Sequence, residues 1–255
     1  MSSISPISSS SYIDYGRFAS GKKIQNAADG AAELSIIQKE DAQARGYKAG
    51  ANNIGTANDL LNVADGAMEG ITDYLQRIRE LAVQASNTAT MTDADRASIQ
   101  AEVDQLKQGI SDIATNTTFN TKSLLDGTNQ ELHIATDSNG NGTSIELPNS
   151  LLQELGIEDF DVTGNFSIED IDKALEKVSS GRSSIGAQSN ALEYAYNYNT
   201  SVRLNTIGAQ SRLEDLDIPT AISEQKKKET LQEYALFMQK KLMEDEANRM
   251  KGFFI

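Results

Sequence analysis

The chain has 255 residues, a formal net charge of −14 at pH 7, 6% aromatic residues, one His, no Cys and no Trp. The acidic balance argues against a surface that neutralises nucleic-acid phosphates, and the lack of Cys excludes disulfides. No apolar stretch approaches the roughly 18 residues that a membrane helix needs, so neither nucleic acid nor membrane is an expected partner.

The first candidate site is a phosphate-binding loop near the N-terminus. Gly16 to Lys22 has the spacing of a P-loop, but Lys23 stands where Ser or Thr would hold Mg²⁺. A P-loop follows a buried apolar strand, whereas a polar, Ser-rich run precedes this one. We therefore interpret the match as chance and expect no nucleotide cofactor.

The first long predicted element is a helix over residues 54–85. Its apolar and small residues recur in alternating steps of three and four, which is the heptad pattern of a coiled coil. We call this row the 54–85 seam: Ile54, Ala57, Leu61, Ala64, Met68, Ile71, Leu75, Ile78, Ala82 and Ala85. A helix of about 30 residues would be roughly 45 Å long.

The polar run of residues 87–93 should end that helix and begin a second one. Thr92 is a suitable N-cap, and Asp93 and Asp95 suit the positive end of a helix dipole. The second helix repeats the apolar pattern, at Ile99, Val103, Leu106, Ile110 and Ile113. Because the loop is short, we predict an antiparallel helical hairpin.

A period of two replaces the heptad pattern near residues 130–148 and predicts a β-hairpin. Residues 132–136 and 143–147 flank a turn-forming run from Asp137 to Gly142. That run imitates the start of an EF-hand, but Pro148 occupies the position of the bidentate carboxylate. The single His133 is expected to be an exposed strand residue, so no metal site is predicted.

The C-terminal part returns to heptad spacing. Ile168, Ile171, Leu175 and Val178 begin a third series, and a break is expected near Asp215 to Pro219. A last helix, roughly 220–251, presents one apolar face that we call the 231–242 stripe: Leu231, Ala235, Met238 and Leu242. The basic run of residues 226–228 lies between acids and is interpreted as a solvated helix face.

The predicted fold class is mainly α: an elongated rod of long antiparallel, coiled-coil-like helices with a small β-hairpin. No alternation of strands and helices indicates a nucleotide fold. Acidic groups such as Glu244 to Glu246 lie around a helix rather than converging on a cleft. The sequence therefore predicts no enzyme and no cofactor.

Four segments together resemble bacterial flagellin. They are residues 20–32, the run from Leu75 to Gln84, residues 118–127 and residues 211–217. The resemblance implies an N-terminal inner-core segment over 1–31, a helical rod domain over 32–213 and a C-terminal inner-core helix over 214–255. Only a short stretch separates Gly127 from Ile168, which implies a minimal form without outer variable domains.

The resemblance also implies a function and a set of partners. A flagellin-like chain would be an extracellular structural subunit of the flagellar filament, exported by the type III apparatus without a Sec signal peptide. Its partners would be copies of itself, an export chaperone, the filament cap and hook-junction proteins, and a host Toll-like receptor for flagellin. The inner-core or chaperone contact would use the 231–242 stripe.

Both ends of the chain depart from the family pattern. The residues before Ser20 are Ser-rich, and the end of the last helix is more charged than the family tail. The alternative function is therefore a minor or non-polymerising secreted flagellin paralogue that acts through a chaperone, a regulator or a host receptor.

The residues that match the family's receptor-binding surface are Gln76, Arg77 and Leu81, with Glu102 on the second helix. Arg77 beside an exposed apolar Leu81 would suit an interface anchor, whether for a receptor or a neighbouring subunit. In the competing interpretation, Leu81 only widens the core stripe and Arg77 pairs with a nearby acid. The sequence leaves both open.

Overall fold

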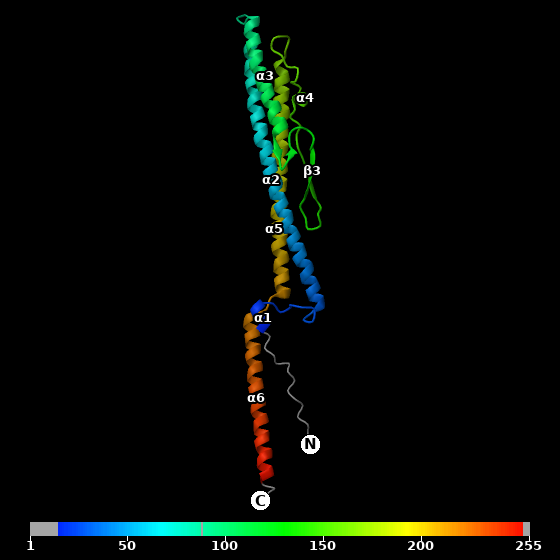
Figure 1. Ribbon diagram of the computed structural model, residues 1–255, viewed down its shortest axis with the longest axis vertical. Helices are drawn as coiled ribbons and strands as arrows, with labels where there is room; N and C mark the ends of the chain where they lie inside the picture. Colours follow the sequence, from blue (N-terminus) through cyan, green and yellow to red (C-terminus); the bar gives the residue numbers. More distant parts are fainter. Residues whose placement is uncertain (1–14, 88, 252–255) are drawn as a thin grey trace. The chain divides into compact units, whose positions relative to one another are not determined.

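The computed structural model describes residues 15–87 and 89–251. Its class is mainly α, as predicted, with two small antiparallel sheets (Figure 1). The helices are α1 (Tyr15–Ser20), α2 (Ala31–Ala85), α3 (Asp93–Asn116), α4 (Leu152–Leu155), α5 (Ile168–Glu214) and α6 (Ile218–Lys251). The strands are β1 (Thr118–Phe119), β2 (Lys122–Ser123), β3 (Glu131–Ala135) and β4 (Gly142–Glu146).

The chain divides into two compact units. Residues 42–205 form one unit, and the residues up to 41 together with those from 206 onward form the other. α2 and α5 each contribute residues to both units. No helix among the described residues is long and apolar enough to cross a membrane.

α2 confirms the predicted helix over 54–85 and extends it at the N-terminal end. The helix has 55 residues and begins at Ala31. Every residue of the 54–85 seam is buried, and none is more than 2% exposed. The residues before Ile54 include Ile37 and Ala44, which are also buried. Each lies one position off the register of the 54–85 seam, so the row did not extend to them and the pattern understated the helix.

α3 packs against α2 in the antiparallel direction, as predicted. Thr92 caps it: the Asp95 backbone N–H donates to the Thr92 hydroxyl at 3.2 Å, and the Asp95 carboxylate accepts from the Thr92 N–H at 2.9 Å. Glycines permit a close approach, because a Cβ at Gly70 would lie 3.3 Å from Ile113 and one at Gly109 would lie 2.9 Å from Tyr74.

α5 also runs antiparallel to α2. The Arg182 Nε donates to Asp65 at 2.8 Å, and the Arg79 Nε donates to Asp172 at 2.6 Å, so numbers rise along α2 as they fall along α5. The buried residues of α5 are Ile171, Ala174, Val178, Ile185, Leu192 and Asn199. The helix is continuous through residues 194–198, where the apolar pattern blurs because the tyrosines there are exposed.

The predicted β-hairpin forms from β3 and β4, with Leu132 opposite Ile145 and Ile134 opposite Thr143. Ile145 is buried, whereas His133 is exposed, as expected. The turn depends on Asp137, whose Oδ1 accepts the N–H groups of Asn139 and Asn141, each at 2.8 Å. Turn chemistry therefore accounts for these residues.

The tip of this hairpin sits on two glycines of α2. A Cβ at Gly50 would lie 2.1 Å from the Thr136 carbonyl oxygen, and one at Gly46 would lie 2.5 Å from Ser138. Asn53 donates to the Ala135 carbonyl at 3.0 Å, and the buried Asn199 of α5 donates to the Thr136 carbonyl. The hairpin tip therefore packs against both α2 and α5.

The short elements α1, β1, β2 and α4 were not predicted. β1 and β2 form a tight hairpin whose turn residues Asn120 and Thr121 have φ values of 46° and 66°. Glycine usually fills such positions, so the turn lacks its usual sequence signal. The single-turn helix α4 is also without a sequence signal in the heptad pattern, and its C-cap is Gly156 with φ 82°.

Candidate interaction surfaces

The first surface joins residues 21–23, after α1, to residues 214–216, between α5 and α6, and both segments belong to the same compact unit. Lys22 forms a β-bridge with Asp215. The Leu216 N–H donates to the Gly21 carbonyl at 2.7 Å, and the Lys23 N–H donates to the Glu214 carbonyl at 2.8 Å. Gly21 has φ 69°, a left-handed conformation that glycine adopts without strain. Residues 20–32 and 211–217, two of the motifs singled out in the sequence, therefore meet.

Ion pairs reinforce this junction. The Lys22 ammonium pairs with the Glu214 carboxylate, and this hydrogen bond raises the pKa of Lys22. Asp29 accepts the N–H groups of Gln25 at 3.0 Å and Asn26 at 3.1 Å and also pairs with Arg17. The two backbone bonds, more than Arg17, lower the pKa of Asp29. The first residues of the P-loop-like run, Gly16 to Ser20, lie in helix α1.

The second surface surrounds Arg77 on α2. Its Nε and Nη2 donate to one oxygen of Glu102 at 2.9 and 2.7 Å, and its Nη1 donates to Glu80 at 3.0 Å. Glu102 is the larger cause, before Glu80, of the raised pKa of Arg77. Gln76 is exposed beside them. The predicted residues Gln76, Arg77 and Glu102 thus lie together on the exposed side of the α2–α3 pair.

Leu81 is buried, which decides between the two interpretations that the sequence left open. The side chain is 2% exposed and belongs to the core of the 42–205 unit. The other interpretation fits the geometry: Leu81 widens the core stripe and Arg77 pairs with acids. α2 is covered by both α3 and α5, so its buried face must be broader than a single heptad row.

The third surface is the 231–242 stripe of α6. Leu231, Met238 and Leu242 are 58%, 40% and 51% exposed, and Ala235 is half-buried. α6 begins at Ile218 rather than Thr220, because the Asp217 carboxylate accepts the Thr220 N–H at 3.3 Å and caps the helix. Pro219 is tolerated in this first turn, where its missing N–H costs no helical bond. The basic run of residues 226–228 is exposed, as expected.

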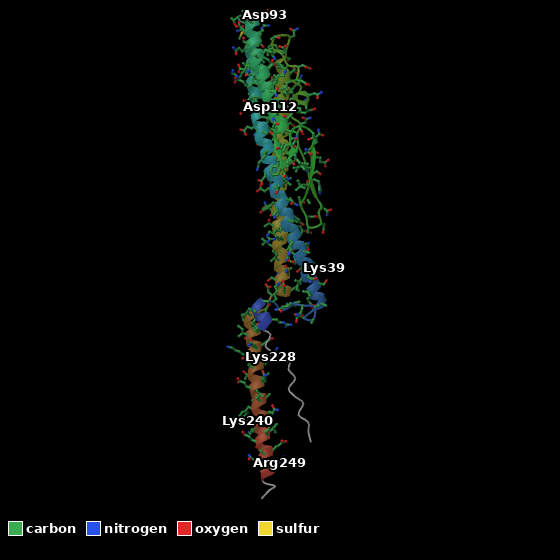
Figure 2. The ribbon with its side chains drawn as sticks, viewed as in Figure 1. Lys39, Asp93, Asp112, Lys228, Lys240 and Arg249 are labelled. Carbon is green, nitrogen blue, oxygen red and sulfur yellow. The ribbon has the colours of Figure 1, made fainter. Side chains whose placement is uncertain are left out.

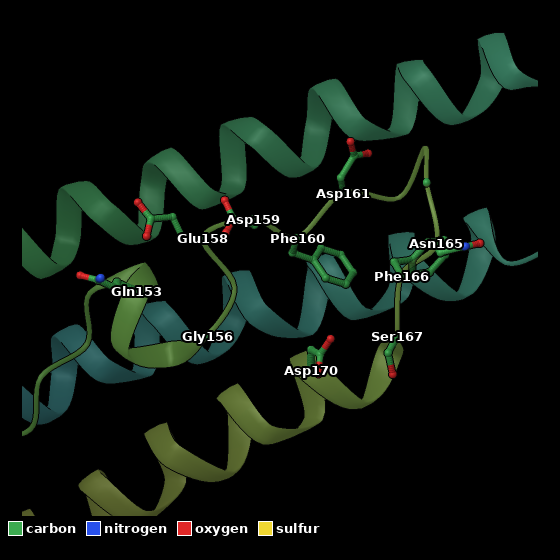
Figure 3. Close-up of a pocket in the computed structure, with 11 residues that line it drawn as sticks. Gln153, Gly156, Glu158, Asp159, Phe160, Asp161, Asn165, Phe166, Ser167 and Asp170 are labelled. Atoms are coloured by element: carbon green, nitrogen blue, oxygen red, sulfur yellow. The ribbon is translucent and has the colours of Figure 1, made fainter.

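A recess of about 630 Å³ lies beside the loop between α4 and α5. Figure 3 shows its carboxylates, including Glu158, Asp159 and Asp161, spread along the loop around Phe160. Lys107 of α3 holds the loop by donating to the carbonyls of Glu158 at 2.5 Å and Phe160 at 3.2 Å. Within residues 15–87 and 89–251, no group of three or more His, Cys, Asp or Glu could hold a metal ion.

Several contacts were missed from the sequence. The Lys22–Glu214 pair and the Asp29 turn lie within residues 20–32 and 211–217. Those segments indicated the family resemblance but not these contacts. The glycine pair at 46 and 50 has the spacing of two small residues one helical turn apart, which signals close backbone approach. That spacing could have predicted where the hairpin tip packs against α2.

Comparisons with known proteins agree across most of the chain. A profile of the bacterial flagellin N-terminal helical region matches residues 3–130, and one of the bacterial flagellin C-terminal helical region matches residues 168–248. Both matches extend beyond the four segments that resemble flagellin in the sequence. A flagellin of Halalkalibacterium halodurans is 35% identical over 82% of this chain and 79% of its own length.

A flagellar filament core protein of Brachyspira hyodysenteriae, flaB2, is 31% identical over 80% of this chain and 79% of its own length. The crystal structure of a Bacillus cereus flagellin is similar with a TM-score of 0.51 and 30% identity, covering 58% of this chain and 88% of that one. The chain therefore belongs to the bacterial flagellin family and is a structural subunit of the flagellar filament rather than an enzyme.

Proposed function

We propose that the chain assembles with copies of itself into the filament through the 231–242 stripe and the helical surfaces of the 42–205 unit. The observation that carries this proposal is the contrast between a fully buried 54–85 seam and an exposed stripe on α6. Removing large apolar side chains from water lowers the free energy, so burial of the stripe against a partner helix would stabilise the assembly.

The division of labour along the chain is part of this proposal. Residues 1–31 and 214–255 would form the inner segments of the filament, and residues 32–213 would form the rod domain. The grouping of the two terminal segments into one compact unit supports that division, and so does the bonded junction of Gly21 to Lys23 with Glu214 to Leu216. Within the proposed inner segments, residues 1–14 and 252–255 lie outside the described part of the chain.

The remaining partners are proposals of the same kind. An export chaperone would hold the 231–242 stripe before assembly, after which the type III apparatus would deliver the chain to the cap. The exposed cluster of Gln76, Arg77 and Glu102 would face either a neighbouring subunit or a host Toll-like receptor. Its arginine is charged at any physiological pH and already oriented by two acids, which suits a rim contact.

Seeded polymerisation tests the assembly directly. Purified chain is mixed with short filament fragments and examined by electron microscopy and sedimentation, beside Leu231→Asp and the exposed control Glu233→Gln. The parent and the control should elongate the seeds, whereas Leu231→Asp should not. Parent protein that stays monomeric with seeds present would refute the proposal.

A further inference from the structure

The 231–242 stripe is symmetric about its own centre. Its four residues are separated by steps of four, three and four, so a two-fold axis through the middle of the stripe maps it onto itself. On that axis, Leu231 of one copy faces Leu242 of the other, and Ala235 faces Met238. This layering is the arrangement of an antiparallel coiled coil, in which facing positions of two helices alternate.

Charged residues continue the same heptad positions on both sides of the stripe. Lys228 and Glu224 precede Leu231 by three and seven residues, and Asp245 and Arg249 follow Leu242 by three and seven. All four are exposed on α6, and Figure 2 shows Lys228 and Arg249 along that helix. The two-fold axis places Lys228 of one copy against Asp245 of the other and Glu224 against Arg249. Each of these pairs occurs twice in the dimer.

The charges select both the partner and its direction. A parallel, in-register pair of α6 helices would place Lys228 on Lys228 and Asp245 on Asp245, and such like-charge layers are unfavourable. Reversing one helix converts each of these layers into an opposite-charge pair. The facing residues extend from Glu224 to Arg249, about 39 Å at 1.5 Å per residue. Apolar layers at the centre and ionic layers at both ends fit a second copy of α6.

We propose that free subunits pair through α6 as antiparallel homodimers. The pairing covers the 231–242 stripe before any filament exists and is weak and concentration-dependent, because only a few layers are apolar. It goes beyond filament assembly and does not depend on it: a chain that forms no filament can still dimerise, and a chain that cannot dimerise can still extend seeds.

Charge reversal in the full chain tests the ionic layers by analytical ultracentrifugation over a concentration series. Lys228→Glu places like charges in two layers and should weaken the dimer at least about tenfold. The double variant Lys228→Glu with Asp245→Lys should restore association to within about threefold. Lys226→Glu has the same charge change on the outer face of the helix and should leave association unchanged.

Disulfide trapping tests the direction, since the chain has no Cys of its own. An equimolar mixture of the Leu231→Cys and Leu242→Cys chains should cross-link to each other on mild oxidation. Each variant alone should not, because identical positions would lie about 16 Å apart, beyond disulfide reach. A parent chain that is monomeric throughout, equal weakening by Lys226→Glu, or preferential self-cross-linking of Leu231→Cys would overturn the proposal. Seeded elongation, measured on the same proteins, reports filament assembly independently.

Discussion

The 42–205 unit and α6 carry apolar rows of the same kind but in opposite situations. In α2 the row is covered by α3, α5 and the hairpin, so Leu61 is 0% exposed. In α6 the equivalent Leu231 is 58% exposed. A repeat of three and four residues therefore predicts that a helix has a partner face, but it does not say whether the same molecule supplies the partner. The difference separates folding of the subunit from its assembly.

Truncating one leucine in each row should give the largest contrast. Leu61→Ala should lower the free energy of unfolding by about 2–5 kcal/mol, since it removes a fully buried side chain and leaves a cavity. Leu231→Ala should change it by less than about 0.5 kcal/mol in dilute monomer, because little area is buried there. Urea unfolding of both variants at low concentration measures the contrast, and similar losses would show that α6 is covered within the monomer.

Two glycines of α2 test how closely the 42–205 unit is packed. Gly50→Ala should destabilise the chain by about 1–3 kcal/mol, because the new Cβ would overlap the Thr136 carbonyl of the hairpin tip. Gly55→Ala, where nothing lies within 4 Å of the new Cβ, should instead stabilise by about 0.5–1 kcal/mol. Thermal unfolding distinguishes them, and a stabilising Gly50→Ala would mean that the hairpin does not rest on α2.

The partly exposed ion pair between α2 and α5 should give a smaller, pH-dependent effect. The hydrogen bond from Arg182 lowers the pKa of Asp65 from its ordinary value near 3.8. The unfolded chain therefore binds this proton more readily, so the stabilisation is present above that value and is lost as the pH falls below it. Asp65→Asn should flatten the acid side of the stability profile, with a loss within about 1 kcal/mol at neutral pH. An unchanged acid limb would contradict the assignment.

The exposed Arg77 cluster should give the smallest effect on stability. Arg77→Ala removes bonds to Glu102 and Glu80 that solvent screens, so the unfolding midpoint should not change measurably. If the cluster is an interface, seeded elongation or receptor binding should weaken while the fold is intact. Arg79→Ala is a matched control on the same helix. Equal effects of the two substitutions on binding would remove the argument for a site at Arg77.

The sequence predicted best what a local pattern encodes directly. The 54–85 seam, the Thr92 cap and the turn at Asp137 each depend on neighbours along the chain, and all three form as expected. The sequence alone left the exposure of Leu81 open, because a heptad row describes one partner helix, whereas α2 has neighbours on two sides. Leu60 lies off the same row and is also buried, for the same reason.

The contacts that escaped prediction involve polar residues with distant partners. Asn199 looks like a surface residue in sequence, yet it is 3% exposed because a hairpin carbonyl lies against it. Asn120 and Thr121 form a turn without the glycine that would announce it. Lys22 and Glu214 are far apart in the chain, and no local pattern pairs them.

Hydrogen exchange measured by mass spectrometry tests the central contrast most directly, on dilute monomer and on assembled filament. Amides of residues 54–85 should be strongly protected in both samples, because that row is buried within each subunit. Amides of residues 224–249 should exchange rapidly in the dilute monomer and be protected in the filament. Strong protection of α6 in the dilute monomer, equal to that of α2, would contradict the account.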